Sequence, residues 1–194
     1  MKTAIQFGTY KGNDDFYEEI KDQEFDLIVL IEPQTEYNDK IKECYKDLDG
    51  WVLENIAIDP DPSKDFLELW ICHCLTSQDI KHILKHHPSQ RVEFEGEQRK
   101  VPCLSPTQLF EKYNLTTIDF LSIDTEGMDE TIINSLDFDR FKIKKIDYER
   151  SHIDDSRVEE FLKSKGYIIS RATPSDALHP NHADANTIAT LNNV

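Results

Sequence analysis

Short apolar runs alternate along this chain with segments in which apolar residues recur every three or four positions. The runs predict strands at 3–7, 26–31, 51–58, 118–123, 144–149, 167–170 and 187–191. The amphipathic segments predict helices at 15–20, 35–47, 105–113, 129–136 and 156–165. We expect Ser105 to cap the third of these helices with Pro106 in its first turn, Ser156 to cap the last, and Gly166 to end it. An additional strand at 66–74 and a charged loop or edge hairpin at 92–100 interrupt the alternation. This order predicts a doubly wound, mainly parallel α/β sheet of seven strands with helices on both faces.

The most informative strand is followed at once by a group of acidic residues. The apolar run that ends at Ile123 leads into Asp124, Glu126 and Asp129, with Gly127 among them. In open α/β sheets, ligands bind outside the carboxyl ends of the strands. A single acid here would be explained by the preference of helix N-termini for negative charge. Three acids around a glycine favour a functional site instead.

Two further positions follow strand ends in the N-terminal half. Gly8, Thr9 and Gly12 form a turn between the first strand and the first helix, although the spacing fits neither the dinucleotide-binding nor the P-loop glycine motif. Glu32 follows the second strand, 24 positions after Gly8. An acid at about that distance holds ribose hydroxyls in nucleotide-binding α/β folds, so we favour this role for Glu32 over that of a solvated turn residue.

Three other groups of polar residues allow two interpretations each. Asn55 interrupts the predicted third strand, where its amide meets either an adenine edge or local backbone groups. Cys72-His73-Cys74 lacks a second Cys/His pair at zinc spacing, so alternation on a strand explains it better than a metal site does. His82 and His86 have a spacing that would suit a metal on a helix, but a solvated helix face is the simpler interpretation. We therefore predict no metal ligands.

Composition narrows the choice of partners. The 194 residues suit one domain with a sizeable core, and we place a substrate-specific insertion within it at about 75–100. The formal charge of −16 argues against nucleic acid and anionic lipid as partners.

The four cysteines have no framework spacing, which favours reduced thiols. The sequence shows neither a signal peptide nor an apolar run long enough to cross a membrane, so we expect a cytoplasmic protein.

The segment from Asp119 to Asp129 resembles the D-x-L-K-I-D-x-E-G-x-E signature of the FkbM-type methyltransferases, a branch of the class I group that uses S-adenosylmethionine. Other pieces that resemble the family follow in the same order, namely Gly8–Gly12, Ile31-Glu32-Pro33, Asn55–Ile58, Val101–Leu109 and Tyr148-Glu149. The resemblance extends from Ala4 to about Tyr167. It implies a class I methyltransferase-like sheet whose last strand is antiparallel.

The resemblance also implies a binding site for S-adenosylmethionine. The methionine part of the cofactor would lie over the turn that contains Gly8, Thr9 and Gly12. Glu32 would hold the ribose hydroxyls, Asn55 and Ile56 would border the adenine, and Asp124 would face the methyl donor. The cofactor-binding residues implied are thus Gly8, Thr9, Gly12, Glu32, Asn55, Ile56 and Asp124.

The implied reaction is methylation of a hydroxyl on a small molecule or glycan. Asp124 and Glu126 would lie at the reacting groups, and Asp124, Glu149 or His152 would remove the acceptor's proton. A divalent ion held by Asp124 and nearby acids is an alternative means of acidifying the acceptor. Gln6 stands where the family usually has an acid, which keeps a catalytically inactive cofactor-binding module open as an alternative. N-methylation on the same fold is the other alternative, and the sequence assigns no oligomeric state.

Overall fold

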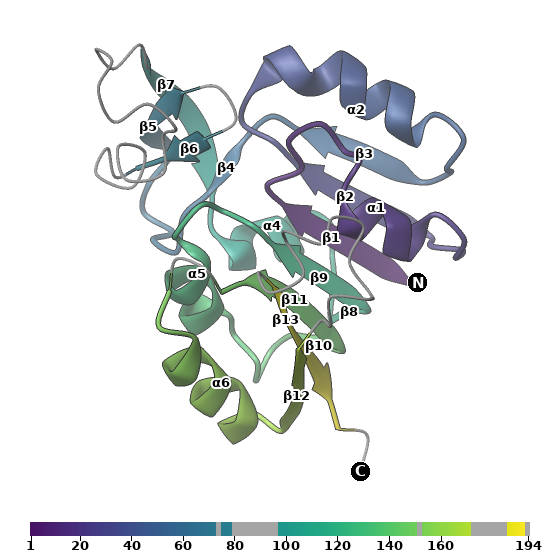
Figure 1. Cartoon of the computed structure of the whole chain (residues 1–194), viewed down its shortest axis with the longest axis vertical. Coiled ribbons are helices and arrows are strands. Elements are labelled where there is room, and N and C mark those ends of the chain that lie inside the picture. Colours follow the sequence, from purple (N-terminus) through teal and green to yellow (C-terminus); the bar gives the residue numbers. More distant parts are fainter. Residues whose placement is uncertain (73–74, 79–96, 151–152, 172–185, 193–194) are drawn as a thin grey trace.

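A computed structural model describes residues 1–72, 75–78, 97–150, 153–171 and 186–192. Among these residues seven strands form one sheet (Figure 1). In spatial order they are β12 (Tyr167–Arg171), β13 (Asn186–Leu191), β11 (Lys145–Glu149), β9 (Phe120–Ile123), β1 (Thr3–Phe7), β2 (Leu27–Ile31) and β3 (Trp51–Glu54). β13 pairs antiparallel with β11 and β12, and the other neighbouring strands in this sheet are parallel. This arrangement confirms the predicted fold, including its antiparallel last strand.

Helices cover both faces of the sheet. They are α1 (Asp15–Ile20), α2 (Asn38–Tyr45), α4 (Pro106–Lys112), α5 (Asp129–Ser135) and α6 (Asp155–Ser164), with a short 3-10 helix, η1 (Thr35–Tyr37), before α2. Successive side chains of a strand point to opposite faces. Ala4 of β1 therefore packs with buried residues of α1 and α2, whereas Ile5 and Phe7 pack with buried residues of α4, α5 and α6. Two apolar cores, one on each face, hold the sheet in place.

A second, smaller sheet stands beside the carboxyl edge of the main one. Its strands, in order, are β4 (Ala57–Ile58), β7 (Glu97–Leu104), β5 (Phe66–Cys72) and β6 (Leu75–Ser77). The prediction of one continuous strand over 51–58 was wrong. The chain leaves the main sheet after Glu54, because the Asn55 side chain donates to the Glu32 carbonyl oxygen, and β4 then pairs with β7. A two-stranded parallel pair, β10 (Lys142–Ile143) with β8 (Thr117–Ile118), completes the described strands.

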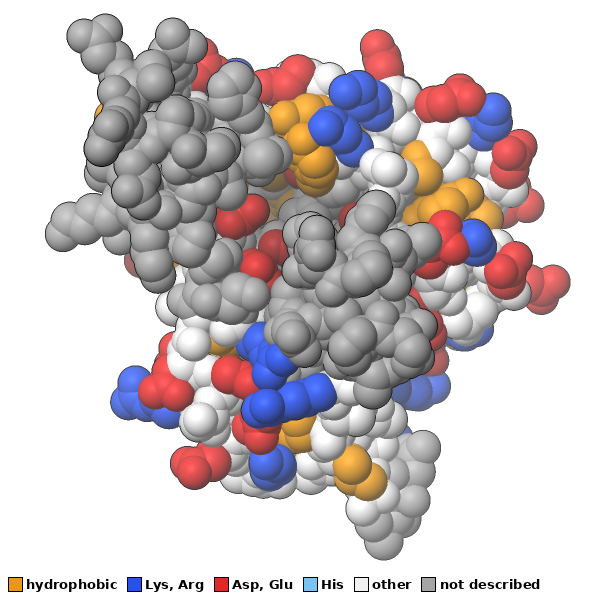
Figure 2. Space-filling model, in the orientation of Figure 1, with side chains coloured by type: hydrophobic (Ala, Val, Ile, Leu, Met, Phe, Trp, Pro, Cys, Tyr) orange, Lys and Arg blue, Asp and Glu red, His pale blue; other side chains and the backbone are white. Residues whose placement is uncertain are grey.

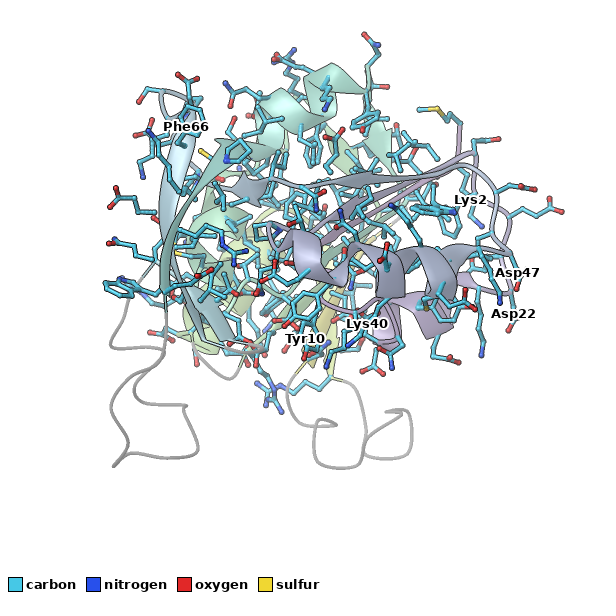
Figure 3. The ribbon with its side chains drawn as sticks, turned by 90° about the horizontal axis from the view of Figure 1, so that it is seen from above. Lys2, Tyr10, Asp22, Lys40, Asp47 and Phe66 are labelled. Atoms are coloured by element: carbon cyan, nitrogen blue, oxygen red, sulfur yellow. The ribbon has the colours of Figure 1, made fainter. Side chains whose placement is uncertain are left out.

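The strand β5 directs alternate side chains to opposite sides. Leu67 and Leu69 are buried, whereas Phe66 is 52% exposed and carries the Lys100 ammonium over its ring. Figure 3 shows Phe66 at the outer end of the small sheet, away from Tyr10 of the glycine turn. The inner face of the small sheet is thus apolar and faces the main sheet.

Helix termini follow the predicted signals with one exception. Ser105 caps α4 with its side chain and forms a capping box with Gln108, and Pro106 occupies the first turn, as predicted. Gly166, with φ of +91°, follows the C-cap of α6, also as predicted. Ser156 does not cap α6. Asp154 does so instead, because its carboxylate reaches the backbone N–H of Arg157.

Several predictions fall on residues 73–74, 79–96 and 151–152, which lie outside the described residues. They include the histidines of the 76–90 segment and most of the predicted insertion at about 75–100. The description of the whole chain as one domain also stays a prediction. In the residues that are described, no helix is long and apolar enough to cross a membrane.

Candidate active site

The strand register brings the ends of five neighbouring strands to one level. Ile31 of β2 lies opposite Phe7 of β1, Phe7 opposite Ile123 of β9, and Ile123 opposite Tyr148 of β11. Glu54 of β3 lies opposite Ile31. The next residue on each strand is one of those selected from the sequence, so a single row runs Asn55, Glu32, Gly8, Asp124, Glu149.

The glycine turn fits closely against the end of β9. Gly8 has φ of +87°, a conformation that L side chains rarely adopt, and a Cβ atom on it would lie 1.8 Å from the Asp124 carbonyl oxygen. The backbone N–H groups of Gly8 and Thr9 both donate to the Ile31 carbonyl oxygen, at 3.0 Å each. Gly12 also has positive φ, of +83°. The turn therefore bends sharply and leaves bare backbone at the centre of the row.

Glu32 is 4% exposed and is held by two backbone N–H groups. Its Oε2 accepts from the Tyr10 N–H at 2.7 Å, and its Oε1 accepts from the Gln34 N–H at 2.8 Å. Burial raises the pKa of Glu32 to about 7, and the two backbone bonds oppose that rise. Each carboxylate oxygen keeps a second lone pair, so the side chain is oriented and still able to accept hydroxyl hydrogen bonds.

Acidic side chains crowd around Asp124. Asp124 is an exposed residue that lines the cavity, and the protein packed around its carboxyl raises the pKa of that group well above the ordinary value. The charges of Glu149, Asp129 and Glu126 raise this pKa further. Asp129 is itself 1% exposed, and burial raises its pKa to about 7 although Thr125 donates to it through its backbone N–H and hydroxyl. This end of the row would hold a cation well and would give up its own protons when a cation binds.

A cavity of about 330 Å³ lies between this row and the small sheet. The residues of the main sheet and its loops that line it include Gly8, Tyr10, Glu32, Pro33, Gln34, Ile56, Asp124, Thr125, Glu126 and Met128. The small sheet contributes Ala57, Ile58, Leu67, Leu69, Thr76 and Ser77. Figure 2 shows acidic side chains inside the recess at the centre of this face. One side of the cavity is therefore acidic and the opposite side mostly apolar.

The structure places the sequence-predicted site residues in three groups. Gly8, Glu32, Ile56, Asp124 and Glu126 line the cavity. Among the described residues, the lining does not include Thr9, Gly12, Asn55 or Glu149. Thr9, Asn55 and Glu149 lie next to lining residues in sequence or in the row, whereas Gly12 packs against Ile41 and Tyr45 of α2. His152 lies outside the described residues.

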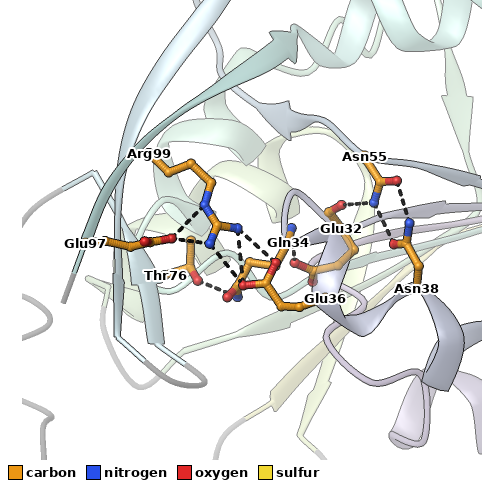
Figure 4. Close-up of polar contacts among 8 residues, drawn as sticks. All are labelled: Glu32, Gln34, Glu36, Asn38, Asn55, Thr76, Glu97 and Arg99. Carbon is orange, nitrogen blue, oxygen red and sulfur yellow. Dashed lines mark hydrogen bonds and ion pairs between the residues drawn. The ribbon is translucent and has the colours of Figure 1, made fainter. Parts of the chain in front are cut away.

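The Asn55 side chain is bonded to the protein on both of its polar atoms. Its Nδ2 donates to the Glu32 carbonyl oxygen at 2.9 Å, and its amide exchanges hydrogen bonds with the Asn38 amide (Figure 4). This matches the second of the two interpretations of Asn55, in which it satisfies local groups.

Sequence reasoning missed the wall that the small sheet supplies. Alternation along 66–72 shows that Leu67 and Leu69 share a face, but nothing local says that this face borders a cavity. Thr76 and Ser77 lie in a polar stretch that carries no motif, and Gln34 directly follows the Glu32-Pro33 pair without standing out. Only the pairing of β5, β6 and β7 brings Leu67, Leu69, Thr76 and Ser77 to the carboxyl edge of the main sheet.

The position where the family usually has an acid is occupied by an amide that contacts one. Gln6 is 3% exposed, and its Nε2 donates to Oδ2 of Asp14 at 2.6 Å. Burial raises the pKa of Asp14, which also caps α1 through the Tyr17 N–H. A carboxylate is thus present beside the glycine turn, although it comes from the start of α1.

Comparison with family models identifies the chain. The model of the FkbM methyltransferase domain matches residues 6–169. The chain belongs to the FkbM methyltransferase family. No curated protein sequence matches it.

Solved structures agree on the fold. An FkbM methyltransferase from Methylobacillus flagellatus KT superposes with a TM-score of 0.52 at 11% identity, over 97% of this chain and 43% of that one. Fibrillarin in its complex with Nop5p superposes with a TM-score of 0.50 at 14% identity, over 99% of this chain and 73% of that one. The chain therefore spans less than half of the FkbM structure that it matches. At these identities the likeness shows a methyltransferase fold alone.

Membership in the family implies use of S-adenosylmethionine, and the residues present fit that cofactor. Gly8 lines the cavity without a side chain, because the Asp124 carbonyl oxygen occupies the space that a Cβ would take, so the backbone of the turn borders the cavity directly. Glu32 offers an oriented carboxylate for two ribose hydroxyls. The carboxyls around Asp124 suit the positive charge of a sulfonium group.

Proposed function

We propose that this FkbM-family chain transfers the methyl group of S-adenosylmethionine to a hydroxyl oxygen of a small molecule or glycan. The observation that supports this most is the row of Glu32, Gly8 and Asp124 on three adjacent strands. In this proposal Glu32 binds the ribose hydroxyls, the Gly8 turn borders the methionine part of the cofactor, and Asp124 takes part in proton transfer.

The protein's own part in this reaction is to align the groups and to accept a proton. When bound, S-adenosylmethionine supplies an electrophilic methyl group on a sulfonium sulfur. A hydroxyl acceptor must lose its proton as its oxygen forms the new bond to carbon, and a carboxylate at the acidic side of the cavity accepts that proton. Of the three residues predicted for this role, Asp124 lines the cavity and is favoured over Glu149 and His152. Glu126, which was expected at the reacting groups, lines the cavity as well. A raised pKa makes a carboxylate a stronger proton acceptor.

The charge of the chain supports a small-molecule or glycan acceptor over a nucleic acid. The formal net charge is −16, and acidic side chains are visible in the recess itself (Figure 2). A polyphosphate backbone would be repelled from such a surface, whereas a neutral polyol would not.

The test begins with calorimetric titration of the protein with S-adenosylmethionine and S-adenosylhomocysteine. Micromolar binding that Glu32→Ala abolishes would support the cofactor site. Glu36→Ala is the matched control, because it removes the same kind of side chain from a half-exposed position four residues away. No binding by folded wild-type protein at millimolar cofactor would overturn the proposal.

A screen with labelled methyl donor against hydroxylated small molecules and oligosaccharides then tests the reaction. Label found on oxygen by mass spectrometry of the product supports O-methylation, and label on nitrogen shows N-methylation instead. Tight cofactor binding with no transfer to any hydroxyl or amine acceptor would favour the inactive binding module.

A further inference from the structure

Gln34 contacts the cofactor-site carboxylate and the small sheet at the same time. Its backbone N–H donates to Oε1 of Glu32 at 2.8 Å, and its side-chain Nε2 donates to the Thr76 hydroxyl at 2.7 Å (Figure 4). The residue is 3% exposed, so its amide has little access to water. A buried amide that loses its partner is costly, which ties the position of Thr76 to that of Gln34.

The strand β6 is also held from the other side of the cavity. The hydroxyl of Ser77 donates to the backbone carbonyl oxygen of Glu126 at 3.4 Å. Thr76 and Ser77 both line the cavity, and Ser77 is 5% exposed. Two consecutive residues thus link β6 to the loop after β2 and to the loop after β9, the two loops that carry Glu32 and Asp124.

An outer link joins the same two parts of the molecule. Arg99 of β7 binds Glu36 of η1 through both of its terminal nitrogens, and it also pairs with Glu97 (Figure 4). This pair is partly exposed, and exposed ion pairs contribute little to stability. The buried amide of Gln34 is therefore the link with the greater effect on position.

We propose that Gln34 and Thr76 are a positioning pair that couples the cofactor carboxylate Glu32 to the cavity wall formed by β6. A ligand on Glu32 fixes the loop that carries Gln34, and Gln34 in turn fixes Thr76. The wall that an acceptor meets is then held more firmly when the cofactor is in place. This inference rests on the proposed function, because it takes Glu32 as the ribose carboxylate.

The test compares two variants of one side chain. Thr76→Val has almost the same shape as threonine but lacks the hydroxyl, whereas Thr76→Ser keeps it. We expect Thr76→Val to weaken S-adenosylhomocysteine binding about three- to tenfold, the range for one buried hydrogen bond, and Thr76→Ser to stay within about twofold of wild type. Glu36→Gln, which weakens only the outer link, should also stay within about twofold.

Hydrogen exchange separates positioning from a merely structural role. We expect S-adenosylhomocysteine to slow exchange of the Leu75–Ser77 amides in wild type and in Thr76→Ser, and to slow it much less in Thr76→Val. A purely structural defect would raise exchange equally with and without ligand. Gln34→Met removes the same hydrogen bond from its other end, so the double variant with Thr76→Val should bind no more weakly than either single variant.

The outcomes distinguish this inference from the proposed function. If wild type fails to bind S-adenosylhomocysteine, both fall. If wild type binds but Thr76→Val matches Thr76→Ser in affinity and in protection of β6, only the coupling is overturned. Additive losses in the double variant would also overturn it. If Thr76→Val does not fold, the same comparison is made with Gln34→Met.

Discussion

The backbone of Gly8 and the carbonyl oxygen of Asp124 are so close that a Cβ atom on Gly8 would lie 1.8 Å from that oxygen. The glycine turn and the end of β9 therefore fit together only when position 8 has no side chain. The same contact sets the distance between the turn and the acidic end of the row.

Replacing Gly8 by alanine should disturb both folding and binding. The substitution combines a left-handed backbone conformation with a clash against backbone, so we expect a loss of about 2–4 kcal/mol in the free energy of unfolding. We also expect loss of cofactor binding. Gly166→Ala is the control, because Gly166 has φ of +91° but its added Cβ would meet nothing closer than Leu191 at 3.9 Å. Denaturant unfolding and calorimetry should show a smaller loss of stability and unchanged binding for the control, and equal effects of the two variants would contradict the argument.

Replacing Glu32 by glutamine should separate stability from binding. Glutamine keeps the shape of the side chain but removes a carboxylate whose pKa burial raises to about 7. The glutamine Nε2 cannot accept, so either the Tyr10 N–H or the Gln34 N–H loses its partner and the variant should be less stable than wild type at pH 5. Because only the wild type must bury a charge as pH rises, this difference in stability should shrink between about pH 5 and pH 8. The loss of charged hydrogen bonds to ribose should nevertheless weaken cofactor binding by about 1.5–3 kcal/mol or more. Thermal unfolding at several pH values and titration with the cofactor measure the two effects, and a stability difference that does not change with pH, together with unchanged affinity, would refute this account.

The stability of the ligand-free protein should fall as pH rises through neutrality. Burial raises the pKa values of Glu32, Asp129 and Asp147 each to about 7, above their ordinary values of 4.5, 3.8 and 3.8. Between the unfolded and folded pKa values the folded state holds more protons, so the free energy of unfolding decreases with rising pH in that window. We expect a loss of a few kcal/mol, roughly 2–5, between about pH 5 and pH 8, with a shallower slope in Glu32→Gln. Stability that is constant or increases over this range would contradict the raised pKa values.

Binding of the positively charged S-adenosylmethionine should depend on the protonation of the carboxyls around Asp124. A sulfonium cation favours ionised carboxylates around Asp124, and S-adenosylhomocysteine lacks that charge. Below the raised pKa values these groups are protonated and attract the cation weakly. The affinity for S-adenosylmethionine relative to S-adenosylhomocysteine should therefore rise with pH, by up to about tenfold per pH unit for one coupled proton. Titrations in buffers of different ionisation enthalpy should detect proton release with the methyl donor, and a ratio independent of pH would show that the acidic group does not contact the sulfonium.

The capping box of α4 offers a structural substitution away from the cavity. Ser105 accepts from the Gln108 N–H at 3.2 Å, and the Gln108 side chain accepts from the Ser105 N–H at 2.8 Å. Ser105→Ala should cost about 1 kcal/mol of unfolding free energy and leave cofactor affinity unchanged. The effect of Gln108→Ala should be less than additive with it, because the two residues form one motif. A change in cofactor affinity would show that α4 communicates with the cavity.

Local sequence determined which segments become strands and helices and which residues stand at their ends. A strand buried on both faces needs a continuous apolar run, so such a run identifies the strand. The residue that follows the last apolar position of the run then lies at the edge of the sheet. Because the strands are parallel and in register, the residues after Ile31, Phe7 and Ile123 had to meet at one edge. That is why Glu32, Gly8 and Asp124 were found from the sequence.

Only the tertiary structure decided where the third predicted strand breaks, which residue caps α6 and which side chains form the second wall of the cavity. The run from Trp51 to Ile58 is apolar throughout most of its length, and only the bonds of Asn55 to Glu32 and Asn38 show that it breaks into two strands. Asp154 and Ser156 are equally good capping residues by type, and only the backbone geometry assigns Asp154 to the cap. The cavity wall depends on contacts such as that of Gln34 with Thr76, 42 residues apart. No pattern of local periodicity encodes such a pairing, because it exists only once two separately folded segments pack against each other.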